Sequence, residues 1–242
     1  MLVLVLSDIH ANLTALEAVL SDAGNYDAVW CLGDTIGYGP DPNECLERLQ
    51  SLPNLQCLIG NHDQAALGLI PITRFNQDAR QAATWTQAQL TPSSQEFLRG
   101  LQPMMVIGDF TLAHGSPREP VWEYIADPYT ADRNFDAFET DYCLVGHSHL
   151  PLMYHRPAAE AYALPMQVGV DETVFLQPRM IINPGSVGQP RDLNPQSGYA
   201  LLDLEAKSWK MQRVAYDVTS VQLRILQAGL PERQALRLAA GW

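Results

Sequence analysis

The sequence predicts an α/β fold in which two β-sheets pack against each other and helices cover their outer faces. The chain opens with the order strand, helix, strand, which is typical of a βαβ unit with a parallel sheet. From about residue 104 onward, short apolar segments alternate with turn residues, which indicates further strands. The chain has 242 residues and no internal repeat or clear linker, so we expect a single domain over residues 1–242.

The first predicted strand is the continuous apolar run Leu-Val-Leu-Val-Leu at residues 2–6, which ends in Ser7. Such a run is typical of a strand that is buried on both faces. Asp8 and His10 follow it, at the end of the strand where ligands of α/β sheets bind. A carboxylate and an imidazole together suit Mn, Fe, Co, Ni or Zn. The alternative for this pair alone is an aspartate that caps the next helix and an incidental histidine.

Two more strands in the first part of the chain also end in polar residues. Residues 27–32 lead to Gly33-Asp34, and residues 55–59 lead to Gly60-Asn61-His62-Asp63. The helices expected between these strands cover about residues 12–20, with Asn12 as the N-cap, and 42–52. Three consecutive strands therefore deliver polar side chains to the same edge of the predicted sheet.

A small helical insertion is expected over about residues 64–101, where Thr91-Pro92 provides an N-cap followed by a proline at the first helical position. The later strands are expected at 104–107, 110–114, 141–145, 151–155, 161–168, 173–176, 179–183, 198–204 and 208–214. The later helices are expected at 132–139, after a proline-rich loop at 115–131, and at 219–228 and 231–240, within a C-terminal segment of about residues 217–240.

Composition and charge limit the classes of partner. The net charge of −12 disfavours a protein that binds nucleic acid through its phosphate backbone, and an anionic substrate would need a local source of positive charge. No apolar run approaches the length of a membrane span, and no targeting signal is recognisable. The four cysteines have no C-x-x-C spacing, so we expect reduced core residues, no zinc site built from them, and a cytoplasmic location. The oligomeric state is not readable from the sequence.

Five of the six histidines stand directly after predicted strands, whereas His155 lies inside one. The full set of polar residues at these strand ends is Asp8, His10, Asp34, Asn61, His62, Asp63, His114, His147 and His149. Their residue types fit a hydrolytic centre with two divalent ions about 3.5–4 Å apart. Asp34 is the natural bridge, because it has two oxygens and stands between the other clusters. Such ions would hold a phosphate and lower the pKa of a bridging water to ~7, so that hydroxide becomes the nucleophile.

His62 is expected to have a different role from the ligands. It is the candidate general acid for the leaving oxygen, or a hydrogen-bond donor to the charge of the transition state. Asp63 is expected to hold the His62 ring in the right tautomer. The alternative is that this pair simply begins a helix.

Five motifs, in order along the chain, resemble the calcineurin-like metallophosphoesterase superfamily. They are Asp8-x-His10, Gly33-Asp34, Gly60-Asn61-His62-Asp63, His114-Gly115 and Gly146-His147-Ser148-His149, and the resemblance covers roughly residues 1–215. It implies a four-layer αββα sandwich of two mixed β-sheets flanked by helices. It also implies one metal site of Asp8, His10, Asp34 and His149, a second of Asp34, Asn61, His114 and His147, and His62 as the acid. Manganese is the first candidate metal, with iron, zinc, nickel and cobalt as alternatives.

Two further segments resemble the small prokaryotic phosphodiesterase-like branch, namely residues 33–43 and 183–191. This branch includes enzymes that act on simple phosphodiesters and on dinucleoside polyphosphates. We therefore expect a phosphodiesterase or nucleotide pyrophosphohydrolase with a small phosphate-ester substrate, such as a nucleotide. A phosphomonoesterase or Ser/Thr protein phosphatase is the alternative, although no arginine follows Asp34 as it does in protein phosphatases. A non-catalytic scaffold, as in the retromer subunit that resembles these enzymes, is disfavoured because every ligand position is filled.

Two residues are candidates for substrate binding. Arg191 follows the glycine-rich segment 185–188, whose backbone amides are expected to approach a phosphate; the alternative is a β-turn and a solvated arginine. Tyr38 is expected to stack on a base or line the pocket, with plain packing as the alternative. The insertion is expected to cover the substrate or to form an outer helical layer, and its relevant residues are Arg74, Phe75, Arg80 and Trp85.

Overall fold

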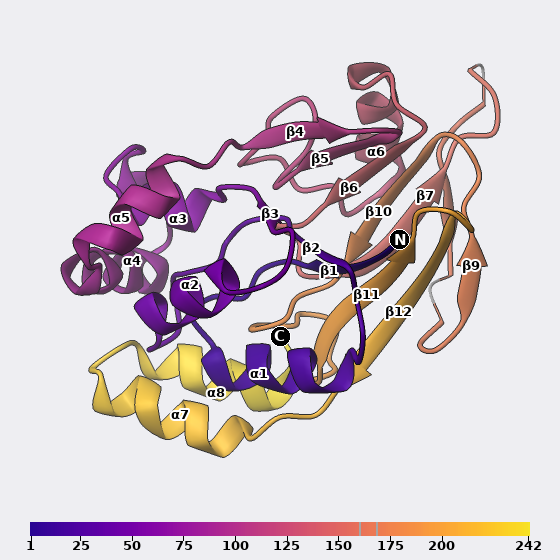
Figure 1. The fold of residues 1–242 in the computed structure, drawn as a ribbon. Helices are drawn as coiled ribbons and strands as arrows, with labels where there is room; N and C mark the ends of the chain where they lie inside the picture. Colours follow the sequence, from indigo (N-terminus) through magenta and orange to yellow (C-terminus); the bar gives the residue numbers. More distant parts are fainter. Residues whose placement is uncertain (160, 168) are drawn as a thin grey trace.

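The computed structural model describes residues 1–159, 161–167 and 169–242, and within them two six-stranded sheets form a sandwich (Figure 1). Across the first sheet the strands are β3 (Gln56–Cys57), β2 (Ala28–Cys31), β1 (Leu2–Leu6), β11 (Ser197–Asp203), β12 (Ser208–Val214) and β9 (Thr173–Phe175). Across the second they are β4 (Met104–Ile107), β5 (Phe110–Ala113), β6 (Tyr142–Val145), β10 (Met180–Pro184), β7 (Pro151–His155) and β8 (Leu164–Met166). Both sheets are mixed, since β1, β2 and β3 run parallel whereas β11 is antiparallel to β1, and since β6 is parallel to β10 whereas β7 is antiparallel to it.

The central strand β1 is buried on both faces, as its apolar sequence predicts. Val3 and Val5 belong to the core between the two sheets, together with Phe110 and Ile182 of the second sheet. Leu4 and Leu6 point to the opposite face and pack in another core cluster. That cluster includes residues of the helices α1 (Leu13–Asp22) and α2 (Pro42–Gln50). The alternation of side chains along one strand thus joins two layers of the fold.

The outer face of the second sheet is covered by α6 (Pro128–Asn134) and the short 3₁₀ helix η2 (Phe135–Ala137). Ala131 and Phe135 pack against Cys143 and Ile181 of the sheet. The result is the order helix, sheet, sheet, helix, which Figure 1 shows with α6 above the sandwich and α1 below it. The predicted αββα architecture is therefore confirmed.

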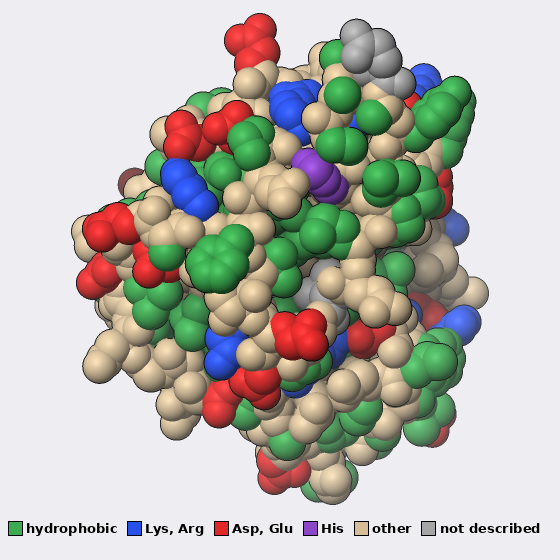
Figure 2. Space-filling view, turned by 90° about the vertical axis from the view of Figure 1, so that its right-hand side faces the viewer, with side chains coloured by type: hydrophobic (Ala, Val, Ile, Leu, Met, Phe, Trp, Pro, Cys, Tyr) green, Lys and Arg blue, Asp and Glu red, His purple; other side chains and the backbone are tan. Residues whose placement is uncertain are grey.

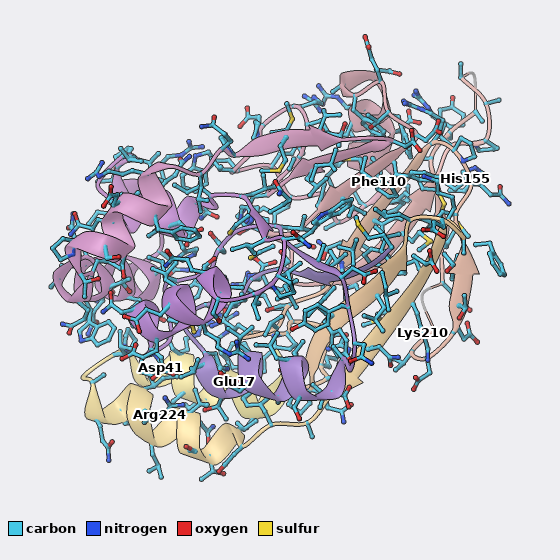
Figure 3. The ribbon with its side chains drawn as sticks, in the orientation of Figure 1. Glu17, Asp41, Phe110, His155, Lys210 and Arg224 are labelled. Atoms are coloured by element: carbon cyan, nitrogen blue, oxygen red, sulfur yellow. The ribbon has the colours of Figure 1, made fainter. Side chains whose placement is uncertain are left out.

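The helical insertion lies beside the sandwich and packs on the C-terminal helices. It comprises α3 (Asn61–Ala66), η1 (Ile72–Arg74), α4 (Gln77–Gln89) and α5 (Pro92–Arg99), and the chain ends with α7 (Val218–Gln227) and α8 (Glu232–Ala240). Ala79 and Ala82 of α4 share one hydrophobic cluster with Val221 of α7 and Leu238 of α8. Arg224 of α7 also forms an ion pair with Asp41, just before α2 (Figure 3). It donates as well to the Thr14 hydroxyl at 2.6 Å.

Several element boundaries differ from the sequence expectations. The strand expected at 55–59 is regular only over β3, although Leu58 forms an isolated bridge with Gln102 and its amide donates to the Cys31 carbonyl. The helix expected at 132–139 begins at Pro128, because Asp127 accepts from the Thr130 amide and caps it. The insertion begins at Asn61 rather than at residue 64. The strand expected at 161–168 is observed as β8, and residue 168 lies outside the described residues.

The cysteines, the helix lengths and the surface can be compared with the expectations from composition. All four cysteines are buried and unpaired as disulfides. Within the described residues, no helix combines the length and the apolar character needed to cross a membrane. Figure 2 looks onto the edge of the sandwich where β9 lies, and acidic, basic and hydrophobic side chains are interspersed there among the coloured residues.

Candidate metal centre

The proposed metal ligands converge from both sheets at the carboxyl ends of parallel strands. Asp8 and His10 follow β1, Asp34 follows β2, Asn61 begins α3 after β3, His114 follows β5, and His147 and His149 follow β6. Each of these seven residues is at most 2% exposed. Polar side chains buried this completely need partners, because leaving water without a compensating interaction is costly.

The backbone at the ligand positions is strained. Asp8, His10, Asp34, His147 and His149 adopt left-handed φ angles of 54°, 49°, 51°, 63° and 60°, a region that residues other than glycine rarely occupy. Such a conformation costs about 1–3 kcal/mol per residue and clusters at functional sites. Hydrogen bonds between neighbouring loops hold it in place: the Asp8 amide donates to the Gly33 carbonyl and the His10 amide to the Asp34 carbonyl, each at 3.0 Å.

The first ligand group consists of Asp8, His10 and His149. The His149 Nε2 atom lies 3.3 Å from Asp8 Oδ1 and 3.1 Å from His10 Nε2. Asp8 Oδ1 is buried and has no hydrogen-bond partner in the described part of the chain, whereas Oδ2 accepts from the Ser7 hydroxyl at 2.6 Å. The free oxygen and the two Nε2 atoms thus form a donor set that fits a divalent transition-metal ion.

The second group consists of Asp34, His114 and His147, with Asn61 beside it. The His114 Nε2 atom lies 3.3 Å from Asp34 Oδ2 and 3.2 Å from Asn61 Oδ1. Among the described residues, His147 Nε2 and Asp34 Oδ2 are both buried without a hydrogen-bond partner. This set also has the ligand types that a transition-metal ion prefers.

Asp34 lies between the two groups. Its Oδ2 atom is 3.3 Å from His114 Nε2 in the second group and 3.7 Å from His10 Nε2 in the first. Its other oxygen, Oδ1, accepts from the His62 amide at 2.9 Å, which fixes the orientation of the carboxylate. This is the position that a ligand shared by two ions requires.

Backbone carbonyls orient three of the imidazole rings. The Nδ1 atoms of His10, His114 and His149 lie 3.2, 2.9 and 2.5 Å from the carbonyl oxygens of Ile36, Leu32 and Gln189. A carbonyl only accepts, so each Nδ1 carries a proton; in neutral His10 and His149 the Nε2 atom then presents its lone pair to the site, and His114 Nε2 does so once its second proton has left. Metal-ligating histidines commonly have this arrangement.

The pKa shifts agree with a site built for cations. Burial raises the pKa of the Asp8 carboxyl to about 6 and holds the pKa values of His10 and His149 well below their usual range, so these rings are neutral. Burial also disfavours ionised Asp34, but the imidazoles of His114 and His62 outweigh it and lower the pKa of that carboxyl. Neutral His10 and His149 beside an ionised Asp34 are in the protonation states that bind metal.

His62 lies beside the ligands but does not join either group. Its ring meets the His10 ring at 87° with centroids 5.0 Å apart, and it also contacts Tyr38 and Phe75 at 4.3 and 4.8 Å. Burial lowers the pKa of His62 to about 4, so the ring is neutral at pH 7. Its Nδ1 atom is buried and has no partner in the described ranges.

The structure does not bring the Asp63 carboxylate to the His62 ring. Asp63 instead accepts from the amides of Gly60, Ile36 and Thr35 at 2.8, 3.0 and 3.4 Å. It therefore ties the loop after β2 to the start of α3. The two residues do begin a helix, which was the alternative reading of the pair.

Arg191 and Tyr38 lie at the site, with different surroundings from those expected. The Val187 and Gly188 amides donate to the carbonyls of Ser7 and Asp8, each at 3.0 Å, so they hold β1 in place and are not available to a phosphate. The Arg191 guanidinium lies 6.0 Å from the Tyr38 ring centroid and donates to Gln189 Oε1 at 2.9 Å. Tyr38 is 7% exposed and packs against both His10 and His62.

A cavity of about 250 Å³ adjoins Asn61 and His62. Its other walls include Arg74 and Phe75 of the insertion and Trp122 and Tyr124 of the loop after β5. The Tyr124 ring stacks on His147 with centroids 3.8 Å apart, and the Arg74 guanidinium lies 4.0 Å from the Trp122 ring centroid. The part of the insertion around Phe75 therefore borders the site. Of the other expected residues, Arg80 donates to the Phe75 carbonyl at 2.8 Å and Trp85 packs against the hydrophobic cluster shared with α7 and α8.

Sequence reasoning missed Trp122 and Tyr124. They lie in the segment 115–127, which carries no helix or strand between β5 and α6. Connections this long without secondary structure are uncommon and are often functional, so the length of the loop is the sequence feature from which these residues could have been found.

Comparisons with known proteins agree with this geometry. Residues 1–207 match the model of the calcineurin-like phosphoesterase superfamily domain. A protein of Methanocaldococcus jannaschii is 34% identical over 249 residues, which cover 99% of this chain and 98% of that protein. A metallophosphoesterase from Sphaerobacter thermophilus is 44% identical, with a TM-score of 0.91 over 100% of this chain and 99% of its own. The symmetrical bis(5'-nucleosyl)-tetraphosphatase of Proteus mirabilis is 29% identical over 100 residues, which are 35% of this chain and 37% of that protein.

Proposed function

The chain belongs to the calcineurin-like phosphoesterase superfamily, and we propose that this metallophosphoesterase cleaves phosphodiester or phosphoanhydride bonds of nucleotide-like substrates with two divalent metal ions. The observation that carries the two-metal proposal is the buried Oδ2 atom of Asp34, which lies 3.3 and 3.7 Å from the Nε2 atoms of His114 and His10. This oxygen accepts no hydrogen bond from any group in the described residues.

The residues that would hold the two ions divide at Asp34. One ion would be held by Asp8, His10, Asp34 and His149, and the other by Asp34, Asn61, His114 and His147. When bound, the ions supply Lewis acidity toward a phosphoryl group and toward water. Manganese is the first candidate, and the His, Asp and Asn donors also suit iron, zinc, nickel and cobalt.

His62 is proposed to act on the leaving group. It lies between the ligands and the 250 Å³ cavity, so a group bound in that cavity would leave past its ring. The pKa of about 4 means that the ring is neutral at pH 7 and carries one N–H. That N–H can stabilise the negative charge that develops on the leaving oxygen.

The lining of the cavity supports a nucleotide rather than a bare phosphate. Phe75, Trp122 and Tyr124 offer aromatic surface, and Asn76 and Arg74 offer polar groups. Flat aromatic side chains beside a few polar ones suit a nucleobase or another aryl group. The similarity to a bis(5'-nucleosyl)-tetraphosphatase over part of the chain points to the same class of substrate.

A substrate panel tests this proposal. The manganese-loaded protein should turn over bis-p-nitrophenyl phosphate and diadenosine tetraphosphate with kcat/KM values at least about ten-fold above that for p-nitrophenyl phosphate, because both carry a second aryl or nucleoside group that makes further contacts with the protein, which the monoester lacks. A clear preference for the monoester would transfer the assignment to a phosphomonoesterase. Absence of turnover with every divalent ion tested, from protein shown to contain metal, would overturn it.

A further inference from the structure

A second cavity lies between the start of α4 and the helix α8. Its volume is about 340 Å³, and it is lined by Asn76, Gln77, Asp78, Arg233, Gln234 and Arg237. Asn76 lines this cavity and also the aromatic cavity beside His62. The two cavities are therefore neighbours, and together they lead from the metal centre to α8.

Four arginines line or approach these cavities without an acidic partner. In the described part of the chain, no carboxylate oxygen lies within 4.0 Å of a side-chain nitrogen of Arg74, Arg191, Arg233 or Arg237. Five other arginines do form such pairs, namely Arg48, Arg118, Arg156, Arg213 and Arg224, and the remaining arginines that also lack one among the described residues, all outside the linings of these cavities, are Arg80, Arg99, Arg133 and Arg179. What distinguishes Arg233 and Arg237 is that they line one cavity together, and in a chain of net charge −12 such a pair suits an external anion.

The charge of these arginines extends to the metal centre. The Arg191 guanidinium lies 6.0 Å from the Tyr38 ring centroid, and the Tyr38 ring packs against His10 and His62. Burial and the like charge of Arg191 lower the pKa of Arg237 to about 10. Asp78 is the acidic side chain on the same lining, so two arginines face one aspartate there. The like charges of Arg191 and Arg237 repel each other, and a bound anion would relieve that repulsion.

Helix α8 holds these groups in fixed positions. Ala235 and Leu238 pack it against Ala79 of α4. The Arg237 Nε donates to the Trp242 carbonyl at 2.6 Å, and the guanidinium of Arg233 lies 5.2 Å from the Trp242 ring centroid.

The same helix also supports Arg191 through two glutamines. Gln234 of α8 accepts from Gln189 Nε2 at 3.1 Å, and Gln189 Oε1 accepts from Arg191 at 2.9 Å. The backbone oxygen of Gln189 is the carbonyl that orients His149. The geometry thus links α8 to both an arginine at the site and a metal ligand.

We propose that the cavity between α4 and α8 is a second anion subsite, in which Arg233 and Arg237 bind a phosphate group of a polyphosphate chain whose scissile phosphate lies at the metal centre. The inference rests on the proposed function and narrows it, because a substrate that reaches both places must carry several consecutive phosphates, as nucleoside and dinucleoside polyphosphates do. Arginine suits this role, since its planar guanidinium binds phosphate oxygens in pairs.

Calorimetric titration with inorganic tripolyphosphate and with orthophosphate tests the subsite. The protein is loaded with Mn²⁺ and kept at one free Mn²⁺ concentration, so that chelation by the ligand is the same for every variant. We expect the parent to bind tripolyphosphate at least about ten-fold more tightly than orthophosphate. In the double variant Arg233→Gln, Arg237→Gln, the affinity for tripolyphosphate should fall at least about ten-fold, and that for orthophosphate by less than about three-fold.

Two further variants complete the design. The matched control is Arg99→Gln, Arg133→Gln, which removes two exposed arginines of α5 and α6 and should preserve the preference for tripolyphosphate. Arg233→Gln alone keeps the contact of Arg237 with Trp242, so it should reduce the preference for tripolyphosphate even if the double variant is unstable. Equal losses for both anions, no loss for either, or a parent without the preference would overturn the subsite. These titrations require no turnover, so failure of the proposed function would be seen separately in the substrate panel.

Discussion

The Nε2 atoms of His10 and His149 lie 3.1 Å apart in the buried centre of the site. Both rings use Nδ1 to donate to a backbone carbonyl, so two lone pairs face each other across this distance. Two acceptors at this separation repel unless a cation lies near both. The same neighbourhood contains the free oxygens of Asp8 and Asp34, which adds negative charge. The fold therefore stores repulsion that bound metal ions would remove.

Metal removal should lower the thermal stability for this reason. Ligands that bind only the folded state at 100 times their Kd stabilise it by about 2.7 kcal/mol. For a chain of this length, that corresponds to a fall in Tm of about 5–10 °C after chelation. Scanning calorimetry before chelation, after chelation and after Mn²⁺ is added back measures this. A Tm that is the same in all three samples would contradict the prediction.

His62→Ala should retain both metal ions, because His62 belongs to neither ligand group. The kcat should fall by about 10²–10³, the usual loss when one hydrogen-bond donor to a developing negative charge is removed. The loss should increase along a series of aryl diesters as the leaving group becomes poorer. Metal content by mass spectrometry serves as the control. An equal loss across the whole series would mean that His62 does not act on the leaving oxygen.

Asp63→Asn should weaken the fold at the loop after β2. The Asp63 carboxylate accepts three backbone N–H groups through its two oxygens, whereas asparagine offers one acceptor oxygen. Leaving a buried N–H without its acceptor costs about 1–3 kcal/mol, so chemical denaturation should show a loss of this size. If the variant instead kept full stability and lost rate with the leaving-group dependence of His62→Ala, Asp63 would act through the His62 ring.

Metal affinity should rise with pH. In the metal-free protein, burial alone would lower the pKa of His114, but the Asp34 carboxylate raises it to about 9. The ring therefore holds a proton at pH 7, and that proton must leave when a metal binds. Asp8, with a pKa of about 6, is already ionised above pH 7. Release of one proton makes the Mn²⁺ affinity rise about ten-fold per unit between pH 7 and 8.5.

Calorimetry in two buffers with different ionisation enthalpies counts this proton directly. We expect about one proton released per chain at pH 7.5. An affinity that is independent of pH, with no proton released, would show that His114 is neutral before the metal binds.

The parts of the fold and site that follow local patterns were predictable from the sequence. Apolar runs such as residues 2–6 identify buried strands, and neighbouring parallel strands end at one edge of their sheet, so Asp8 had to lie close to Asp34, and His114 close to His147. The positions of residues that directly follow a buried strand can thus be predicted from the apolar pattern of that strand.

Features that depend on long-range contacts were not predictable in this way. Gln189 and Gln234 are 45 residues apart in the chain, and their hydrogen bond forms only because α8 packs beside the loop that contains Gln189. The same amide group of Gln189 accepts from Arg191. The backbone partners of Asp63 were not predictable for a related reason. Adjacency to His62 suggested contact with its ring, but successive residues of a helix point in different directions, and in α3 the Asp63 carboxylate turns back to the Gly60 amide.

The metal content of Asp34→Asn tests the two-metal centre most directly. Purified parent protein reconstituted with Mn²⁺ should contain two ions per chain, as should the control Asp141→Asn, which changes an exposed aspartate outside the site. Asp34→Asn should contain fewer than one ion per chain. Its kcat/KM should fall by more than about 100-fold, because mutation of a group that only hydrogen-bonds to a metal ligand already costs about 10–100-fold. An Asp34→Asn protein that still binds two Mn²⁺ ions as tightly as the parent would contradict the account.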